Sequence, residues 1–320
     1  MPSCTQPRWT TCTSSPRATA TTPSRPRTTS MCRTSRSIRA ISRAAPFLLL
    51  LAALPALMWF GRQQRAPRLY RLALVAPFEG IYSATGYSAL PAVRSEVADW
   101  NKRLAPHHIQ IQVWAVDDSD EPALAERRAR ELAADPLVLA VVGHMAPRAS
   151  AAAAPTYHQA GLLQVSPVPI PVSLAGGPYA CLSLGPSPSA INALSAASPG
   201  APLLDLADPD TLENQVRATL AGPVLLPYPY CPSATGALLP QATAEAISSD
   251  AGLDGSPAAV TARAADLALR AINAAAVSAS LDRESVAREA VNLAQDSGWT
   301  WDGSAWYPAG SARVVPCPHQ

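Results

Sequence analysis

Strand and helix signals alternate from residue 68 to residue 184, and this alternation restricts the fold more than any other feature of the chain. Runs typical of strands cover 69–77, 108–116, 137–143 and 161–166. The run at 137–143 is apolar throughout, which is typical of a parallel strand covered on both faces. The repeated order strand–helix–strand predicts an α/β fold built on a doubly wound, mainly parallel sheet.

Three helices are expected between these strands. The first covers 84–104, where apolar residues recur at helical spacing. The second begins after Asp120, which we predict as its N-cap, with Pro122 in its first turn. The third covers 149–160. Ligands of doubly wound sheets bind at the carboxyl ends of the strands, and these ends are predicted at 77–80, 117–120, 143–150 and 166–169.

Several polar residues near these ends have a plain structural interpretation. The acidic residues of 117–121 lack the spacing of a calcium loop, and acids are favoured at a helix N-terminus, so we expect capping rather than a metal site. His107 and His108 would point in opposite directions on a strand, so we expect a solvated turn. His144 follows a predicted strand directly, so it is a candidate for pocket lining.

Motifs for covalent or cofactor chemistry do not occur in the chain. It has no Gly-x-Ser-x-Gly elbow, no Gly-x-Gly-x-x-Gly fingerprint, no phosphate loop and no His-Glu-x-x-His pair. We therefore predict that the protein is not an enzyme and uses no cofactor.

Charge divides the chain into two regions. Residues 1–45 contain eight Arg and no Asp, Glu or Lys, which leaves 17 basic and 23 acidic residues for the remainder. The acidic balance of the remainder argues against a nucleic-acid-binding surface. Residues 1–43 are rich in Ser, Thr, Arg and Pro, so we expect a disordered tail. A nucleic-acid-binding arm and a start at Met31 remain as alternatives for this tail.

An uncharged apolar run follows at 44–61. Its length is at the lower limit for a membrane-spanning helix, and no small-residue cleavage site follows it. Trp59 and Phe60 would suit the membrane interface. We favour a retained transmembrane anchor over a cleaved signal. The additional Arg residues upstream favour an N-terminus inside and a body outside the cytoplasm.

The motifs of the body, taken in order, resemble the first lobe of type I periplasmic binding proteins, specifically the branched-chain amino-acid (Leu/Ile/Val) receptors of ABC importers. The last sixty residues resemble the end of that family, with helices at 258–276 and 283–297 and a hairpin at 298–316. The motifs that carry the resemblance are the loop Pro77–Gly80, Asn101 at a helix end, the acidic turn and helix 117–132, the loop 141–150, the turn Tyr157–Gly161 and the pair Ser166–Pro167.

The chain departs from the family at two points. Family members hold a ligand carboxylate with hydroxyl side chains after two of the strands, whereas this chain has Ala146–Arg148 and Val168–Ile170 there. The segment 185–256 is short for a second lobe. We therefore expect a complete first lobe (68–184), a reduced second lobe (185–256) and C-terminal helices with a hairpin (257–320).

The resemblance implies an extracytoplasmic solute-binding protein of an ABC import system, with an amino acid or small carboxylate as ligand and a permease as partner. The alternative is a sensor or scaffold ectodomain that keeps the fold without amino-acid binding. The residues that we predict to line the cleft are Phe78, Glu79, Tyr82, His144, Met145, Arg148 and Ser166.

Cysteine and tryptophan residues add two expectations. Cys181, Cys231 and Cys317 are an odd number in the body, so one disulfide and one free thiol are expected in an oxidising compartment. Trp299, Trp301 and the pair Trp306–Tyr307 flank a predicted turn at residues 302–303, and we expect them to pack in the core.

Overall fold

The computed structural model describes residues 66–172, 180–197, 256–278, 280–309 and 312–316, together with residues 203, 224–226, 229 and 244–248. The tail 1–43 and the apolar run 44–61 lie outside the described residues, so the expectations for them remain predictions. Across the ranges given above, no helix is long and apolar enough to cross a membrane. The residues from 65 to 320 form one compact unit.

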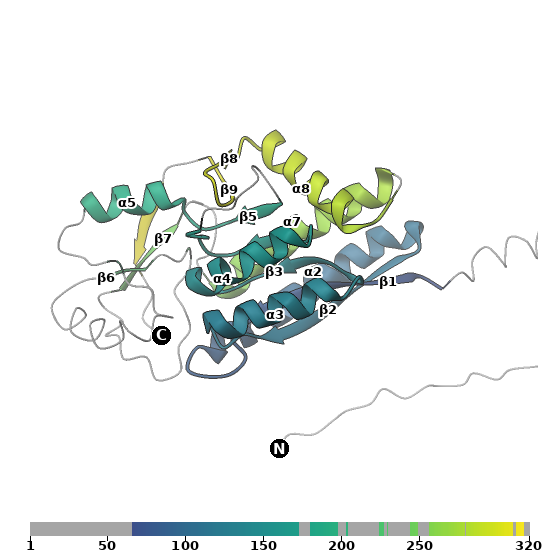
Figure 1. Cartoon of the computed structure of the whole chain (residues 1–320), viewed down its shortest axis with the longest axis horizontal. Coiled ribbons are helices and arrows are strands. Elements are labelled where there is room, and N and C mark those ends of the chain that lie inside the picture. The colour runs from purple at the N-terminus through teal and green to yellow at the C-terminus, as the bar shows by residue number, and fades with distance from the viewer. Residues whose placement is uncertain are drawn as a thin grey trace, which may run out of the picture. The chain divides into compact units, whose positions relative to one another are not determined.

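A seven-stranded sheet forms the centre of this unit (Figure 1). The strand order is β2-β1-β3-β4-β5-β9-β8, and every neighbouring pair is parallel except β8 with β9. The predicted doubly wound, mainly parallel sheet is therefore confirmed. The strands are β1 (Arg68–Ala76), β2 (Ile109–Asp117), β3 (Val138–Val142), β4 (Leu163–Ser166), β5 (Cys181–Ser183), β8 (Thr300–Trp301) and β9 (Trp306–Tyr307).

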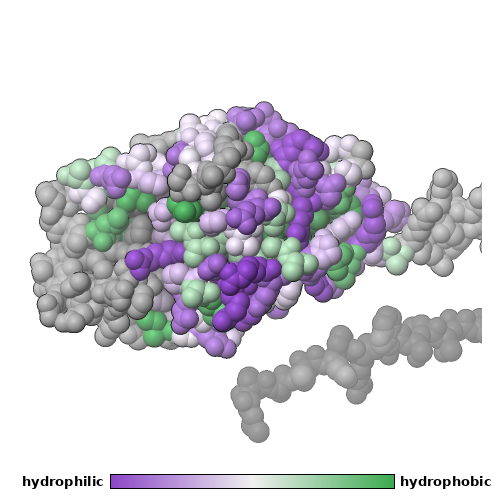
Figure 2. Space-filling model, viewed as in Figure 1, coloured by the Kyte–Doolittle hydropathy of each residue, from purple (hydrophilic) through white to green (hydrophobic). Residues whose placement is uncertain are grey.

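Helices cover both faces of this sheet (Figure 1). Helices α2 (Ser83–Leu104), α7 (Pro257–Ser278) and α8 (Arg283–Asp296) pack on one face. Helices α3 (Pro122–Ala134) and α4 (Pro147–Gln159) pack on the other. The exposed positions of α3 include Glu126, Arg127 and Arg130, and hydrophilic side chains gather over this helix in Figure 2.

Alternate residues of β1 contribute to the hydrophobic cores on the two faces of the sheet. Leu72 and Leu74 belong to the cluster with α2 and α7, whereas Ala73 and Val75 belong to the cluster with α3 and α4. All four side chains are buried, as are all five residues of β3. Burial on both faces of the sheet therefore explains why β3 is apolar throughout.

A second, three-stranded sheet has the order β10-β7-β6, with β6 (Val224–Leu226), β7 (Ala244–Ser248) and β10 (Arg313–Pro316). Besides β6 and β7, the described element within 185–256 is helix α5 (Pro188–Ala197). Of the predicted strand 202–207, only residue 203 is described, and the predicted helix 209–220 lies outside the described residues. The reduced second lobe and the three-part division of 68–320 therefore remain predictions.

The predicted hairpin at 298–316 is shorter than expected. Strands β8 and β9 form the hairpin, but residues 313–316 pair with β7 in the other sheet. The prediction was wrong on this point because the partner of the last strand is distant in sequence. Core packing is confirmed, since Trp306 and Tyr307 are buried and Trp299 and Trp301 pack against the core.

Two further sequence expectations can be compared with the structure. Cys181 is a buried free thiol, and Cys231 and Cys317 lie outside the described residues. His108 has a left-handed backbone, ends the short 3₁₀ helix η1 (Ala105–His107) and is exposed, so the predicted turn is confirmed.

Candidate functional site

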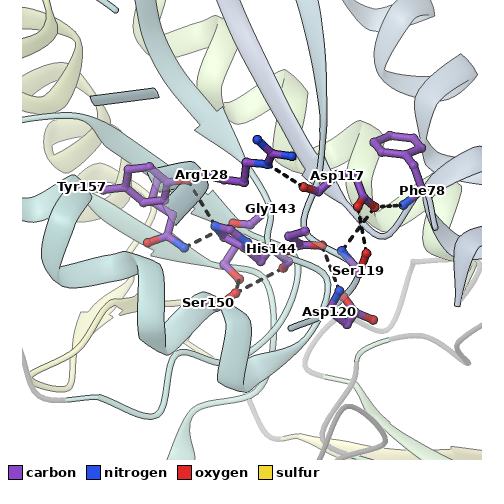
Figure 3. Close-up of polar contacts among 12 residues, drawn as sticks. Phe78, Asp117, Ser119, Asp120, Arg128, Gly143, His144, Ser150 and Tyr157 are labelled. Atoms are coloured by element: carbon purple, nitrogen blue, oxygen red, sulfur yellow. Dashed lines mark hydrogen bonds and ion pairs between the residues drawn. The ribbon is translucent and has the colours of Figure 1, made fainter. Parts of the chain in front are cut away.

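The carboxyl ends of β1, β2, β3 and β4 are joined by a polar network (Figure 3). Asp117, at the end of β2, is its first member. Its Oδ1 accepts hydrogen bonds from the backbone N–H groups of Phe78 (2.6 Å) and Glu79 (3.0 Å) in the β1–α2 loop. The backbone and hydroxyl of Ser119 also donate to this carboxylate. Asp117 thereby ties the β1–α2 loop to the end of the neighbouring strand.

Asp118 follows β2 directly and contacts the residue that leaves the end of β3. Its Oδ2 lies 2.5 Å from Nδ1 of His144, and both side chains are completely buried. Nε2 of His144 lies 3.2 Å from the hydroxyl of Tyr157 on α4. Burial, together with the charge of Asp118, raises the pKa of Tyr157 well above its usual value, so the hydroxyl keeps its proton. All three groups are satisfied when Nδ1 donates to the carboxylate and Nε2 accepts from Tyr157.

Three buried serines continue the network toward β5. Ser150 Oγ donates to the carbonyl of His144 at 3.2 Å and lies 3.0 Å from Ser166 Oγ. Ser166 and Ser183 both donate to the carbonyl of Val168, at 2.7 and 2.9 Å. All three serine side chains are buried. The strand-end hydroxyls are therefore bonded within the protein.

The seven predicted site residues fall into two groups in this structure. His144, Met145 and Ser166 are fully buried, and Met145 accepts a weak hydrogen bond from Thr261 of α7. Phe78, Glu79, Tyr82 and Arg148 reach the surface, the first three around the β1–α2 loop and the fourth in the first turn of α4. Only this second group is accessible to a solute in this conformation. A ligand contact by any of the seven remains a prediction.

Apolar side chains surround the β1–α2 loop. Phe78 packs edge-to-face against Tyr87, with 5.6 Å between ring centroids. Tyr87 is 62% exposed and Ile81 is 54% exposed. The aromatic pair offers a surface that stacks or packs against apolar groups of a ligand.

The predicted capping role of the acidic turn is wrong in part. Helix α3 begins after Glu121, and no side chain caps it, although Pro122 lies in its first turn as expected. Asp120 has a left-handed backbone and is buried. Asp117 instead accepts hydrogen bonds from the β1–α2 loop, and Asp118 contacts His144 in the β3–α4 loop. Within the described part of the chain, no group of three or more His, Cys, Asp or Glu side chains is arranged to hold a metal ion.

The sequence interpretation missed Asp118, Ser150 and Tyr157. A usable signal was present, because consecutive residues of a strand point to opposite sides. Asp117 is the last residue of a strand and Asp118 follows it directly, so the two side chains are expected to face different neighbours. The identity of those neighbours depends on β2 pairing with β1 rather than with β3.

Comparison with solved structures shows the fold. A fatty acid ABC transporter substrate-binding protein from Thermomonospora curvata matches with a TM-score of 0.54 at 14% identity, covering 79% of this chain and 94% of that one. An extracellular ligand-binding receptor from Rhodopseudomonas palustris HaA2 matches with a TM-score of 0.53 at 13% identity, covering 79% and 98%. The branched-chain amino acid transporter substrate binding protein LivJ from Streptococcus pneumoniae, solved with isoleucine, matches with a TM-score of 0.51 at 14% identity, covering 77% and 95%.

Comparisons of the sequence give no match, either to a protein-family model or to a curated protein. The likeness to solved structures therefore rests on the three-dimensional arrangement of the chain and not on a sequence match. The chain has the type I periplasmic-binding fold of ABC transporter substrate-binding proteins.

Proposed function

We propose that the protein is an extracytoplasmic solute-binding protein that captures an amino-acid-like or small carboxylate ligand for an ABC-type importer. The observation that carries the proposal is that aromatic side chains after β1 and a cation after β3 are both accessible. Phe78 and Tyr82 would contact the apolar part of the ligand, and Arg148 would pair with its carboxylate. Solved neighbours of this fold are substrate-binding proteins, which supports binding rather than catalysis.

The start of α4 is suited to an anion. Its N-cap is Ala146, which has no side-chain acceptor for the first N–H groups, and Pro147 follows at the first position. The helix dipole favours negative charge at this end. A carboxylate bound near Arg148 would therefore gain from both the guanidinium and the helix terminus.

A thermal-shift screen of the purified full chain against amino acids, small carboxylates and fatty acids tests this proposal. A ligand at 100 times its dissociation constant should stabilise the fold by about 2.7 kcal/mol. Arg148→Ala should weaken binding of an acidic ligand by about tenfold or more, equivalent to ~1.4 kcal/mol. Arg127→Ala is the matched control, because Arg127 is exposed on α3. Equal affinity of the Arg148 variant and the control would refute the role of Arg148.

The second candidate function is a sensor or scaffold ectodomain that has lost amino-acid binding. The observation in its favour is that Ser150, Ser166 and Ser183 are buried and bonded to one another or to backbone carbonyls. Such a protein would unfold cooperatively without responding to any solute in the screen. A protein partner that co-purifies with the chain would then support this alternative. Both candidate functions include a membrane anchor at 44–61 and a body outside the cytoplasm.

A further inference from the structure

We infer that Asp117 and Asp118 are positioning residues that hold two different loops of the ligand site, one loop each. The inference rests on the proposed function, because the first loop carries Phe78 and Glu79 and the second leads directly into the helix turn that carries Arg148. Asp117 is the last residue of β2, the edge strand of the large sheet, and Asp118 follows it directly.

Asp117 holds the β1–α2 loop through one oxygen. Its Oδ1 accepts from the consecutive N–H groups of Phe78 and Glu79, at 2.6 and 3.0 Å. At the start of α2, the N-cap residue Tyr82 makes no side-chain capping bond. The backbone of Asp117 is anchored in turn, because its carbonyl accepts from Nε of Arg128 at 3.1 Å.

Asp118 holds the β3–α4 loop through a buried histidine. The carboxylate of Asp118 contacts Nδ1 of His144, and the carbonyl of His144 accepts from Ser150 in the first turns of α4. The hydroxyl of Tyr157, a residue of α4, lies within hydrogen-bonding distance of the other ring nitrogen of His144. Asp118 therefore sets the direction in which the chain leaves β3 and enters α4, which places Arg148.

We expect the two ties to act independently because they join different groups: Asp117 contacts the β1–α2 loop, whereas Asp118 contacts His144 after β3. Loss of one tie should loosen one loop and leave the other unchanged. A residue that merely contributes to stability would instead affect both loops together. This difference makes the inference testable without knowledge of the ligand.

Amide hydrogen exchange on the ligand-free full chain measures the two loops separately. In Asp117→Ala, we expect exchange at Phe78 and Glu79 to quicken by about tenfold or more, with segment 143–150 unchanged. In Asp118→Ala, we expect the reverse pattern. Asp117→Asn and Asp118→Asn keep an oxygen acceptor, so exchange in each should lie between wild type and the alanine variant. The Asp118→Asn variant also serves if Asp118→Ala does not fold.

Asp302→Ala is the matched control, since Asp302 accepts from the backbone of Ser304 and Ala305 in the β8–β9 turn, away from both loops. It should leave exchange at 78–79 and 143–150 unchanged. The inference is overturned if either aspartate variant quickens both loops to the same extent, or if neither loop responds. The screen for ligands is a separate measurement. If the chain binds no solute, the proposed function is refuted, but the hydrogen-exchange rates of the two loops still decide the roles of the two aspartates.

Discussion

Arg283 provides a test of how helix α8 is attached to the end of helix α3 and the start of strand β3. It is the first residue of α8, and its guanidinium donates to four backbone carbonyls. The acceptors are Val138 (2.9 Å), Ala133 (2.8 Å), Leu132 (3.2 Å) and Asp135. Three of these carbonyls lie at the C-terminal end of α3, where helical partners are lacking. Arg283→Met would keep most of the apolar stem and remove every donor.

The expected loss follows from these contacts. A hydrogen bond from a charged donor contributes about 1.5–3 kcal/mol, but two of the four bonds share Nη2, and water can reach carbonyls that methionine leaves open. Burial lowers the pKa of Arg283, which shows that desolvation of the guanidinium already opposes its attachment. We therefore expect a net loss of about 2–3 kcal/mol in the free energy of unfolding, or roughly 5–10 °C in Tm for a domain of this size.

Urea unfolding of the full chain, monitored by circular dichroism, measures this loss. Arg288→Met is the control, because Arg288 lies on the same helix with its side chain exposed. The control should change the free energy of unfolding by less than about 0.5 kcal/mol. A loss below about 0.5 kcal/mol for Arg283→Met would refute the reasoning, since it would mean that the four carbonyls are equally well solvated without the guanidinium.

Three further predictions concern a close backbone contact, a helix cap and a thiol. Gly86→Ala should lower stability by about 1–3 kcal/mol in thermal unfolding, because a Cβ at residue 86 would lie 2.1 Å from the carbonyl oxygen of Pro77; an unchanged Tm would contradict this. Asp282 caps α8, and the backbone N–H of Ser285 lowers the pKa of its carboxyl, so its contribution is present above about pH 4 and is lost as pH falls through the folded-state pKa. Urea unfolding between pH 3 and pH 7 should therefore show the stability difference between wild type and Asp282→Asn shrinking at acidic pH, and a constant difference would argue against the cap. Burial raises the pKa of the Cys181 thiol, so iodoacetamide should modify Cys181 only after unfolding, as peptide mapping would show; rapid labelling of the native protein would contradict the buried position.

Local patterns in the chain were enough to predict most elements of residues 68–184. The predicted strand 69–77 is β1 (Arg68–Ala76), and the predicted helix 84–104 is α2 (Ser83–Leu104). These predictions succeed because apolar spacing and proline positions act over a few residues, and burial on both faces follows from an unbroken apolar strand such as β3. The order of these elements also predicted a doubly wound, mainly parallel sheet, since strands joined by helices allow few arrangements.

Contacts between distant segments decided the rest. Asp117 and Asp118 looked like helix caps in sequence, yet their partners are the β1–α2 loop and His144, which are 26 to 39 residues away. The pairing of 313–316 with β7, rather than with the adjacent hairpin, has the same origin. The sequence shows which side chains can donate or accept hydrogen bonds. Strand order and register determine which of these side chains lie close enough to bond. For the same reason, only the tertiary structure separated the buried His144, Met145 and Ser166 from the accessible Phe78, Glu79, Tyr82 and Arg148.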